Sequence, residues 1–424
     1  MRILVYPHDL ALGGSQINAI DLAAGVADRG HEVIIYGIPG PLADYIEEKG
    51  LRFLPAHDLK YRPAPSRIAQ IAAIARRERL DLIHAYEWPP CLDSYFGAGL
   101  ALRVPLLCTV LSMQVMPQVP ASVPLIMGTA DLGAEARKRH RADVWVLEPP
   151  IDVERDNPQI SGREFRSAHS VEDEEFLIVS VSRLALDLKL DALVRGIDAV
   201  DLLASRHRVK LILVGDGPAR DALQCRADDV NRRHGRKVVA LVGADPDPRR
   251  AYAAADLVVA MGSSALRALA IGRPIIVQGE DAFSEPFDEN SCELFLRQGF
   301  YGLADGAPGP NRLLGQIEPL IDDPARRLEL GQFGRAFVSR RFALQRAVDL
   351  QLDVYKSVLE ASPAARISEA VRAAGLAASM EIANHNPLQK RRNRNLQQIM
   401  LSAARSGEWP PPFDAWSAHR RSTA

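Results

Sequence analysis

The chain has 424 residues, more than one ordinary hydrophobic core accommodates, so we expect two domains of about 150–200 residues each. Its formal net charge of −1 excludes a general electrostatic attraction to nucleic acid, and 47% hydrophobic and 25% charged residues are typical of a globular protein. No apolar stretch reaches the ~18 residues that a membrane helix needs, and the N-terminus lacks the features of a signal peptide.

Short apolar runs alternate with longer amphipathic ones in the first half of the chain. We expect strands at residues 3–6, 33–36, 82–85, 106–110 and 144–147, and helices at 16–29 and 66–79. Gly30 is typical of a helix end, and Ser66 of a helix start. This alternation, with continuously apolar strands, predicts a parallel sheet that is covered on both faces.

The second half repeats the pattern. We expect strands at residues 176–181, 209–214, 238–242, 257–260 and 274–277, and helices at 190–204, 220–233, 249–254 and 264–271. The sequence therefore predicts two doubly wound α/β domains, at residues 1–165 and 166–342. Such domains bind ligands at the carboxyl ends of their strands, and we expect a ligand cleft between the two.

The remainder of the chain differs in composition. We expect a helix at residues 343–360 that crosses back to the first domain, and then a helical, basic extension at 361–424. The extension contains a basic cluster at 390–394 and a segment rich in proline and aromatic residues at 408–416. Two interpretations are open, a partly ordered tail on the protein surface or a contact with a membrane or a partner.

Two turns between a strand and a helix could hold an anion. Gly13 and Gly14, followed by Ser15, begin the first helix, where paired glycines allow close approach to backbone N–H groups. Gly262, Ser263 and Ser264 form a similar turn, with Arg267 one helical turn further on. The alternative interpretations are glycines that serve turn geometry alone, serines that only cap the helix, and a solvated arginine.

Two cations follow the first strand of the second domain. Arg183 comes directly after that strand and Lys189 six residues later. Arg183 can bind phosphate oxygens in a bidentate manner, and Lys189 offers a compact point charge. Both residues suit a diphosphate, although two surface cations would give the same spacing.

Several motifs together resemble glycosyltransferase family 4. The run VGDGP at residues 214–218 is similar to that family's signature turn, and Arg183 with Lys189 resembles its GRL…K pair, which binds the donor diphosphate. Further similar blocks are YAAAD at 252–256, ALAIGRPIIV at 268–277, and an N-terminal GG followed by RGHEV at 29–33. The resemblance covers residues 1–355 and implies a GT-B fold, with two Rossmann-like domains that face a cleft.

The resemblance also implies a chemistry. It indicates a transferase that uses a nucleoside-diphosphate sugar, of the UDP or GDP type, with retention of configuration and without a metal ion or cofactor. Arg183 and Lys189 would stabilise the departing diphosphate, and the resemblance adds Gly215 and the glycines at 13, 14 and 262 to the donor site. The partners implied are the donor and an acceptor glycan, lipid or small molecule. The sequence indicates no oligomeric state.

The sequence departs from the family at positions that matter. Arg267 stands where the second glutamate of an E-x7-E pair is expected, and the first glutamate has no counterpart. Glu280 is then the best carboxylate for donor hydroxyls, a solvated loop glutamate being the alternative. Leu111 and Ser112 replace an acceptor-side histidine. The acceptor-side candidates that remain are Ser15, His84 and Glu87, with a structural strand-end histidine as the alternative for His84.

Two other functions stay open from the sequence. A sugar-nucleotide epimerase shares the plan of two domains but needs carboxylates for acid–base catalysis, for which only Glu87 and Glu280 are candidates. The missing glutamates are also compatible with a protein that only binds a nucleotide sugar or a partner. The four scattered cysteines favour reduced thiols and argue against structural zinc. We expect a cytoplasmic protein, with a peripheral membrane contact left open.

Overall fold

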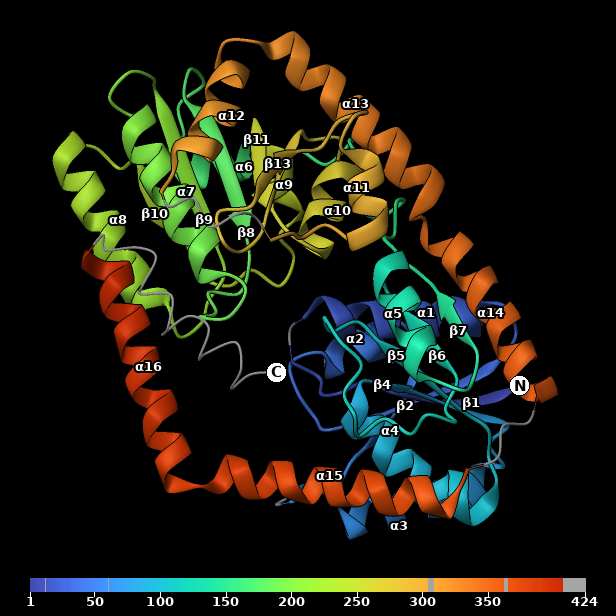
Figure 1. Ribbon diagram of the computed structural model, residues 1–424. Helices are drawn as coiled ribbons and strands as arrows, with labels where there is room; N and C mark the ends of the chain where they lie inside the picture. The colour runs from blue at the N-terminus through green and yellow to red at the C-terminus, as the bar shows by residue number, and fades with distance from the viewer. Residues whose placement is uncertain (12, 60, 304–308, 362–364, 407–424) are drawn as a thin grey trace. The chain divides into compact units, whose positions relative to one another are not determined.

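The computed structural model describes residues 1–406 except 12, 60, 304–308 and 362–364, and it divides into two compact units (Figure 1). Unit 1 comprises Met1–Asp152 and Phe342–Asn386, and unit 2 comprises Val153–Arg341 and Pro387–Ala424. The segment at 408–416, rich in proline and aromatic residues, lies outside the described residues. Each unit has its own sheet and its own core, as the length of the chain predicts.

Unit 1 contains a seven-stranded sheet in the order β3-β2-β1-β4-β5-β6-β7, in which all neighbours are parallel. Side chains alternate between its faces, so that Ile3 and Val5 belong to one core cluster and Leu4 and Tyr6 to another. Its strands are β1 (Arg2–Tyr6), β2 (Glu32–Gly37), β3 (Arg52–Pro55), β4 (Leu82–Tyr86), β5 (Leu106–Val110), β6 (Leu125–Met127) and β7 (Val144–Val146).

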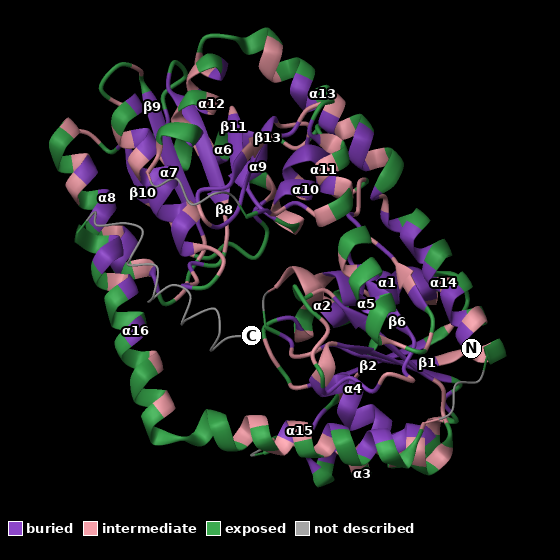
Figure 2. Cartoon of the chain, viewed as in Figure 1, coloured by how far each residue is buried: buried purple, intermediate pink, exposed green. Residues whose placement is uncertain are grey.

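Helices cover both faces of this sheet. Side chains of α1 and α14 pack on one face, and those of α3, α4 and the π-helix η1 pack on the other. The helices of unit 1 are α1 (Gly14–Asp28), α2 (Ala43–Glu48), α3 (Pro65–Glu78), α4 (Trp88–Ser94), η1 (Tyr95–Leu100), α5 (Ala130–Arg139), α14 (Leu344–Ala361) and α15 (Ile367–His385). Figure 2 shows the strands buried between these layers.

Unit 2 contains a six-stranded sheet in the order β10-β9-β8-β11-β12-β13. Its strands are β8 (Phe176–Val181), β9 (Val209–Val214), β10 (Val239–Leu241), β11 (Leu257–Ala260), β12 (Ile275–Gln278) and β13 (Ser284–Pro286). Its helices are α6 (Arg163–Ala168), α7 (Leu190–Leu203), α8 (Arg220–His234), α9 (Arg249–Ala254), α10 (Ser263–Ala270), α11 (Cys292–Gln298), α12 (Asn311–Ile321), α13 (Pro324–Arg341) and α16 (Pro387–Ser406). Side chains of α7, α8, α12 and α16 share one core cluster with this sheet.

The predicted architecture of two doubly wound sheets is confirmed, with three strands that the sequence analysis missed. β3 and β6 are only four and three residues long, too short to give a periodic signal, and β3 ends in a proline. β13 runs antiparallel to β12, so unit 2 is a mixed sheet and not a purely parallel one. The expected strands of both sheets otherwise lie close to their predicted places.

The chain passes between the units at different positions from those expected. Residues 153–165, placed by the sequence in the first domain, belong to unit 2. The reason is α6, which packs on α9 so closely that a Cβ on Gly162 would lie 2.3 Å from the backbone of Ala254. The extension is divided as well, because α15 belongs to unit 1 and α16 to unit 2.

The contact between α1 and α14 gives a test of the packing in unit 1. A Cβ on Gly25 of α1 would lie 2.4 Å from Cγ2 of Val348 in α14, so the side chain of Val348 packs directly on the backbone of α1. We expect Gly25→Val to destabilise the protein by about 2 kcal/mol through overpacking, measured as a lower midpoint of urea unfolding.

Gly315, within α12, is the matched control, because a Cβ there meets nothing within 4 Å. Gly315→Ala should leave stability unchanged or raise it by up to about 1 kcal/mol, since alanine is the better helix former. An unchanged midpoint in Gly25→Val would contradict the close packing of α1 on α14.

Candidate functional site

The loop after β8 is held against the turn after β9 by a close approach of the two backbones. A Cβ on Gly215 would lie 1.8 Å from the carbonyl oxygen of Ser182, and one on Gly217 would lie 2.6 Å from that of Leu184. Both glycines also have positive φ angles, of 150° and 154°. The two glycines of the VGDGP turn therefore allow its backbone to lie against the loop after β8. That loop carries the exposed side chain of Arg183.

Lys189 lies half-buried just before α7 and close to three charged groups. Burial is the main cause that lowers the pKa of its ammonium group to about 8, and the nearby guanidinium of Arg183 lowers it further. The carboxylates of Asp187 and Glu280 act in the opposite direction. The structure therefore brings together Arg183, Lys189 and Glu280, which lie up to about a hundred residues apart in the sequence.

Glu280 is buried, with 3% of its surface exposed, so the alternative of a solvated loop glutamate is wrong. Its Oε2 accepts a short hydrogen bond from the hydroxyl of Tyr301. A Cβ on the preceding Gly279 would lie 1.9 Å from the carbonyl oxygen of Gly302, so this loop and the segment that follows α11 are in backbone contact. Glu280 is thus a buried, hydrogen-bonded carboxylate that lies close enough to Lys189 to act on the pKa of its ammonium group.

An ion pair that the sequence analysis missed supports the loop of Glu280. Arg195 of α7 is 2% exposed, and its guanidinium donates to the carbonyl oxygens of Gly279 and Phe283, each at 3.0 Å. Asp191, one turn earlier, pairs with Arg195 at 3.2 Å and accepts a hydrogen bond from the amide of Ala282. Ala282 has a φ of 65°, a strained conformation that needs such support.

A signal for this pair exists in the sequence. Asp191 and Arg195 stand four residues apart, which places them on one face of α7. Most of their neighbours in this helix are apolar and buried, so two opposite charges among them indicate a buried pair with further partners. Only the structure shows that the partners are backbone groups of a distant loop.

The turn before α10 is only partly available to a ligand. Gly262 has a φ of 61°, and its amide donates to the carbonyl oxygen of Phe300 at 2.6 Å. The hydroxyl of Ser264 donates to the carbonyl oxygen of Val181 and accepts from the hydroxyl of Tyr252. The prediction that this turn offers its amides to an anion is therefore wrong for Gly262. The amides that can receive an anion here are those of the first turn, at Ser263 and Ser264.

Arg267 lies on α10 with its side chain 23% exposed. Its Nε is 3.9 Å from Oδ2 of Asp156, a buried carboxylate in the segment that leads from unit 1 into unit 2. The alternative of a wholly solvated arginine at this position is therefore wrong. Arg267, which stands in place of the expected glutamate, thus lies close to the carboxylate of Asp156.

The side chain of Gln16 packs against the glycine-rich loop of unit 1. Gly13 precedes α1, and a Cβ there would lie 2.4 Å from Oε1 of Gln16. Gln16 in turn donates from Nε2 to Asp9 at 2.9 Å. Gly14 is the first residue of α1, and Ser15 follows it, half-buried. The absence of a side chain at Gly13 thus makes room for the glutamine that links the loop to the end of β1.

His84 is not an acceptor-side residue, and its structural interpretation is the correct one. Its ring is fully buried in β4. Nδ1 lies 2.8 Å from the hydroxyl of Tyr355 in α14, and Nε2 lies 2.7 Å from Oγ1 of Thr109 in β5. Burial lowers the pKa of the imidazole to about 3, so it is neutral at physiological pH. His84 connects the sheet of unit 1 to α14.

Glu87 shapes the loop that follows β5. It has a φ of 67°, and one carboxylate oxygen accepts from the amides of Leu111 and Ser112, both at 2.9 Å. The other oxygen accepts from the hydroxyl of Ser112 at 2.8 Å. Glu87 therefore orders the two residues that replace the expected acceptor-side histidine.

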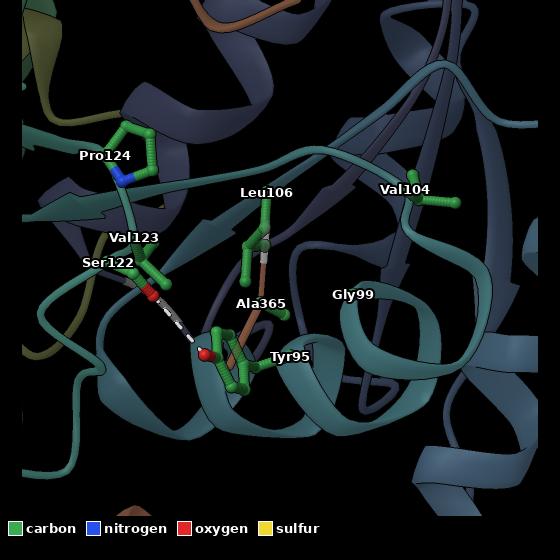
Figure 3. Close-up of a pocket in the computed structure, with 8 residues that line it drawn as sticks. All are labelled: Tyr95, Gly99, Val104, Leu106, Ser122, Val123, Pro124 and Ala365. Atoms are coloured by element: carbon green, nitrogen blue, oxygen red, sulfur yellow. Dashed lines mark hydrogen bonds between the residues drawn. The ribbon is translucent and has the colours of Figure 1, made fainter. Parts of the chain in front are cut away.

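A small pocket in unit 1 lies away from the predicted residues. It is lined by Tyr95, Gly99, Val104, Leu106, Ser122, Val123, Pro124 and Ala365 (Figure 3). Its polar contact is between the hydroxyls of Tyr95 and Ser122, at 3.3 Å. None of the predicted site residues lines it. We assign it no role.

Within the described ranges, no group of three or more His, Cys, Asp or Glu side chains is placed to hold a metal ion. In the same ranges, no helix is both long and apolar enough to cross a membrane.

Comparisons with known proteins agree with this arrangement. Residues 12–117 match the model of Glycosyltransferase Family 4, and residues 175–299 match that of Glycosyl transferases group 1. The glycosyltransferase MJ1607 of Methanocaldococcus jannaschii is 22% identical over 395 residues, which cover 84% of this chain and 97% of that protein.

Solved structures with a similar fold include a glycosyltransferase from Rickettsia africae, with a TM-score of 0.69, 14% identity, and coverage of 84% of this chain and 98% of that one. Anabaena Alr3699/HepE in complex with UDP-glucose has a TM-score of 0.66 and 20% identity, and covers 84% of this chain and 100% of its own. These similarities confirm the predicted GT-B fold.

The buried His84 predicts how stability depends on pH. A histidine that has a pKa of about 3 in the folded state and about 6.5 when unfolded stabilises the fold above pH 6.5. This stability is lost as the pH falls from 6.5 towards 3, because the unfolded state binds the proton and the folded state does not. We expect the free energy of unfolding of the wild type to fall more steeply over this range than that of His84→Asn, by up to about 1.4 kcal/mol per pH unit.

The exposed His57 is the control. Replacing it by asparagine should leave the pH profile of the wild type unchanged. Parallel profiles of the wild type and His84→Asn in urea titrations would show that His84 is not buried in its neutral form.

Proposed function

The chain belongs to the group 1 glycosyltransferases of family 4, and we propose that it transfers a sugar from a nucleoside-diphosphate donor, held on unit 2, to a hydroxyl of an acceptor not yet identified. The observation that carries this proposal is the pair of cations at the carboxyl end of β8. Arg183 is exposed on a loop whose shape depends on two glycines, and Lys189 lies beside it with a lowered pKa. A diphosphate supplies the negative charge that such a pair needs.

The mechanism that we propose is electrostatic. When the bond between the sugar and the diphosphate breaks, negative charge grows on the phosphate oxygens. Arg183 can bind two of these oxygens, Lys189 contributes a point charge, and the first-turn amides of α10 add fixed dipoles. Groups that are already oriented towards developing charge need no reorganisation during the reaction, which makes this term large.

Glu280 is our candidate for the residue that binds the hydroxyl groups of the donor. It is buried, held by Tyr301, and close enough to Lys189 to act on the pKa of the ammonium group. We propose that it replaces the carboxylate pair of the family, whose second position is occupied by Arg267. Retention of configuration, independence from metal ions and the absence of a cofactor are further parts of the proposal.

The nucleotide base of the donor and the location of the protein in the cell are proposals that do not rest on the geometry of the site. The complexes of Anabaena Alr3699/HepE with UDP and with UDP-glucose make UDP the first nucleotide to test here. Within the acceptor class, a glycan, a lipid and a small molecule are all compatible with the proposal. A cytoplasmic location, with or without a peripheral contact to the membrane, fits the use of such a donor and stays a prediction.

The transfer proposal is tested with Arg183→Ala and Lys189→Ala. Each should reduce the rate of sugar transfer by about a hundredfold, because each removes one stabilising contact with the leaving diphosphate, while the melting temperature stays close to that of the wild type. Arg206→Ala is the control, since this exposed cation of unit 2 pairs with Glu318 and should be neutral.

Near-normal rates in both variants would remove the donor assignment. Tight binding of UDP-sugars by the wild type, without transfer to any of a broad set of acceptors, would favour the interpretation as a binding protein. Turnover of the donor without an acceptor, giving an epimer, would favour an epimerase.

Lys189 also predicts the pH dependence of donor binding. Its ammonium group loses a proton around pH 8 in the free protein, so the affinity for UDP should fall as the pH rises above 8, by up to about tenfold per pH unit. The dissociation constant can be measured by calorimetry from pH 7 to pH 10.

Lys189→Arg is the matched variant, because arginine keeps its charge throughout this range. Its affinity should change little with pH. An equal decline in the wild type and in Lys189→Arg would assign the pH dependence to another group.

A further inference from the structure

The segment of residues 299–303, which follows α11, contacts two loops of the candidate donor site. The carbonyl oxygen of Phe300 accepts a hydrogen bond at 2.6 Å from the amide of Gly262, the residue before α10. The carbonyl oxygen of Gly302 accepts a hydrogen bond from the amide of Glu280 at 3.0 Å. The 299–303 segment therefore joins the turn before α10 to the loop that carries the buried carboxylate.

The backbone that carries Tyr301 is itself fixed by its neighbours. Tyr301 donates from its amide to the carbonyl oxygen of Gly299 at 2.9 Å, and its own carbonyl oxygen accepts from Nε2 of Gln298 at 2.9 Å. The preceding Phe300 is buried, and its ring stacks on that of Phe295 with the ring centroids 5.4 Å apart. The side chain of Tyr301 therefore starts from a backbone that is held on both sides.

Tyr301 and Arg195 support Glu280 in different ways. Arg195 donates to the carbonyl oxygens of Gly279 and Phe283, and so holds the backbone of the loop. The hydroxyl of Tyr301 donates to Oε2 of Glu280, and so contacts the carboxylate itself. The last side-chain torsion of a glutamate is soft, and a hydrogen bond from a hydroxyl to the carboxylate is strong enough to fix it. Tyr301 thus determines how the carboxylate is turned within a loop that Arg195 holds in place.

One hydrogen bond leaves the carboxylate of Glu280 able to accept others. Its two oxygens together offer about four lone pairs, so the bond from Tyr301 leaves acceptor capacity for the hydroxyl groups of a ligand. A carboxylate that is already oriented binds such hydroxyls without the loss of side-chain freedom that binding otherwise requires. Removal of the tyrosine hydroxyl should therefore weaken the binding of ligand hydroxyls, although the carboxylate itself remains.

We propose that Tyr301 is a positioning residue, which orients Glu280 and thereby sets the affinity of unit 2 for the sugar of the donor but not for its diphosphate. The inference rests on the proposed function, because it takes Glu280 as the residue that binds the hydroxyl groups of the donor. The two affinities are separable because Arg183 and Lys189 belong to the loop after β8, whereas Tyr301 contacts the loop after β12.

The test compares nucleotide sugars with the nucleotides alone in Tyr301→Phe. The probes are UDP-glucose against UDP, and GDP-mannose against GDP, with dissociation constants measured by calorimetry on the full-length protein. The variant keeps the ring and loses only the hydroxyl, so its melting temperature should stay close to that of the wild type. We expect it to bind the nucleotide sugar about tenfold more weakly, which is what one hydrogen bond to a charged group contributes, and to bind the nucleotide alone like the wild type.

A double-mutant cycle assigns the effect to Glu280. Glu280→Ala should itself weaken the binding of the nucleotide sugar, and the addition of Tyr301→Phe should then cause no further loss. The matched control is Tyr36→Phe, because Tyr36 is a buried tyrosine of unit 1 whose hydroxyl donates to Oε1 of Gln70 at 2.7 Å. This control should bind the nucleotide sugar and the nucleotide like the wild type.

The inference is overturned if Tyr301→Phe binds the nucleotide sugar like the wild type, or if the affinities for the nucleotide sugar and the nucleotide fall to the same extent. Tighter binding of the nucleotide sugar also overturns it, because the hydroxyl would then compete with the sugar for Glu280. A further loss in the Glu280→Ala background would assign the effect to another residue. All these results leave nucleotide binding by the wild type intact, and with it the proposed donor site. If the wild type binds none of the probes, the donor site itself is wrong and the inference fails with it.

Discussion

The loop that follows β8 places two like charges, Arg183 and Lys189, close enough for one to act on the pKa of the other. Burial and the neighbouring guanidinium of Arg183 both disfavour the protonated form of Lys189. The carboxylates of Asp187 and Glu280 oppose this effect only in part, since the pKa of the ammonium group still falls to about 8. A diphosphate bound here, as proposed above, would add negative charge and so favour the protonated form of the lysine.

The surroundings of these cations are fixed mainly by backbone contacts. Gly215 lets the turn after β9 lie against Ser182, and Gly279 lets the loop of Glu280 lie against Gly302. A buried guanidinium, that of Arg195, then joins two carbonyl groups of that loop. A loop held in this way keeps its carboxylate in place without the ligand, and preorganisation of this kind is what electrostatic catalysis requires.

The fold and the cations Arg183 and Lys189 could be predicted from the sequence more fully than the side chains and loops that surround these cations. Alternating apolar and amphipathic runs are local, so the strand before Arg183 and the helix after Lys189 could be predicted directly. The network of Asp191 and Arg195 could not, because its partners are carbonyl groups more than eighty residues away. His84 shows the same limit, since its burial depends on Tyr355, which comes from a helix near the other end of the sequence. Glu87 needed the structure as well, because its partners lie on a loop beyond the next strand.

Two stretches of chain form unit 1, and the segment that contains β8 to α13 lies between them in the sequence. Val348 and Tyr355 of α14 belong to the same core cluster as Ile20 and Val26 of α1. During synthesis on the ribosome, the sheet of unit 1 must therefore wait for α14 with part of one apolar face uncovered. At about 5–20 residues per second, the roughly 190 residues between the two stretches take about 10–40 s to translate. The nascent chain should be open to chaperones over that interval, and its first domain can be completed only after most of the second has emerged.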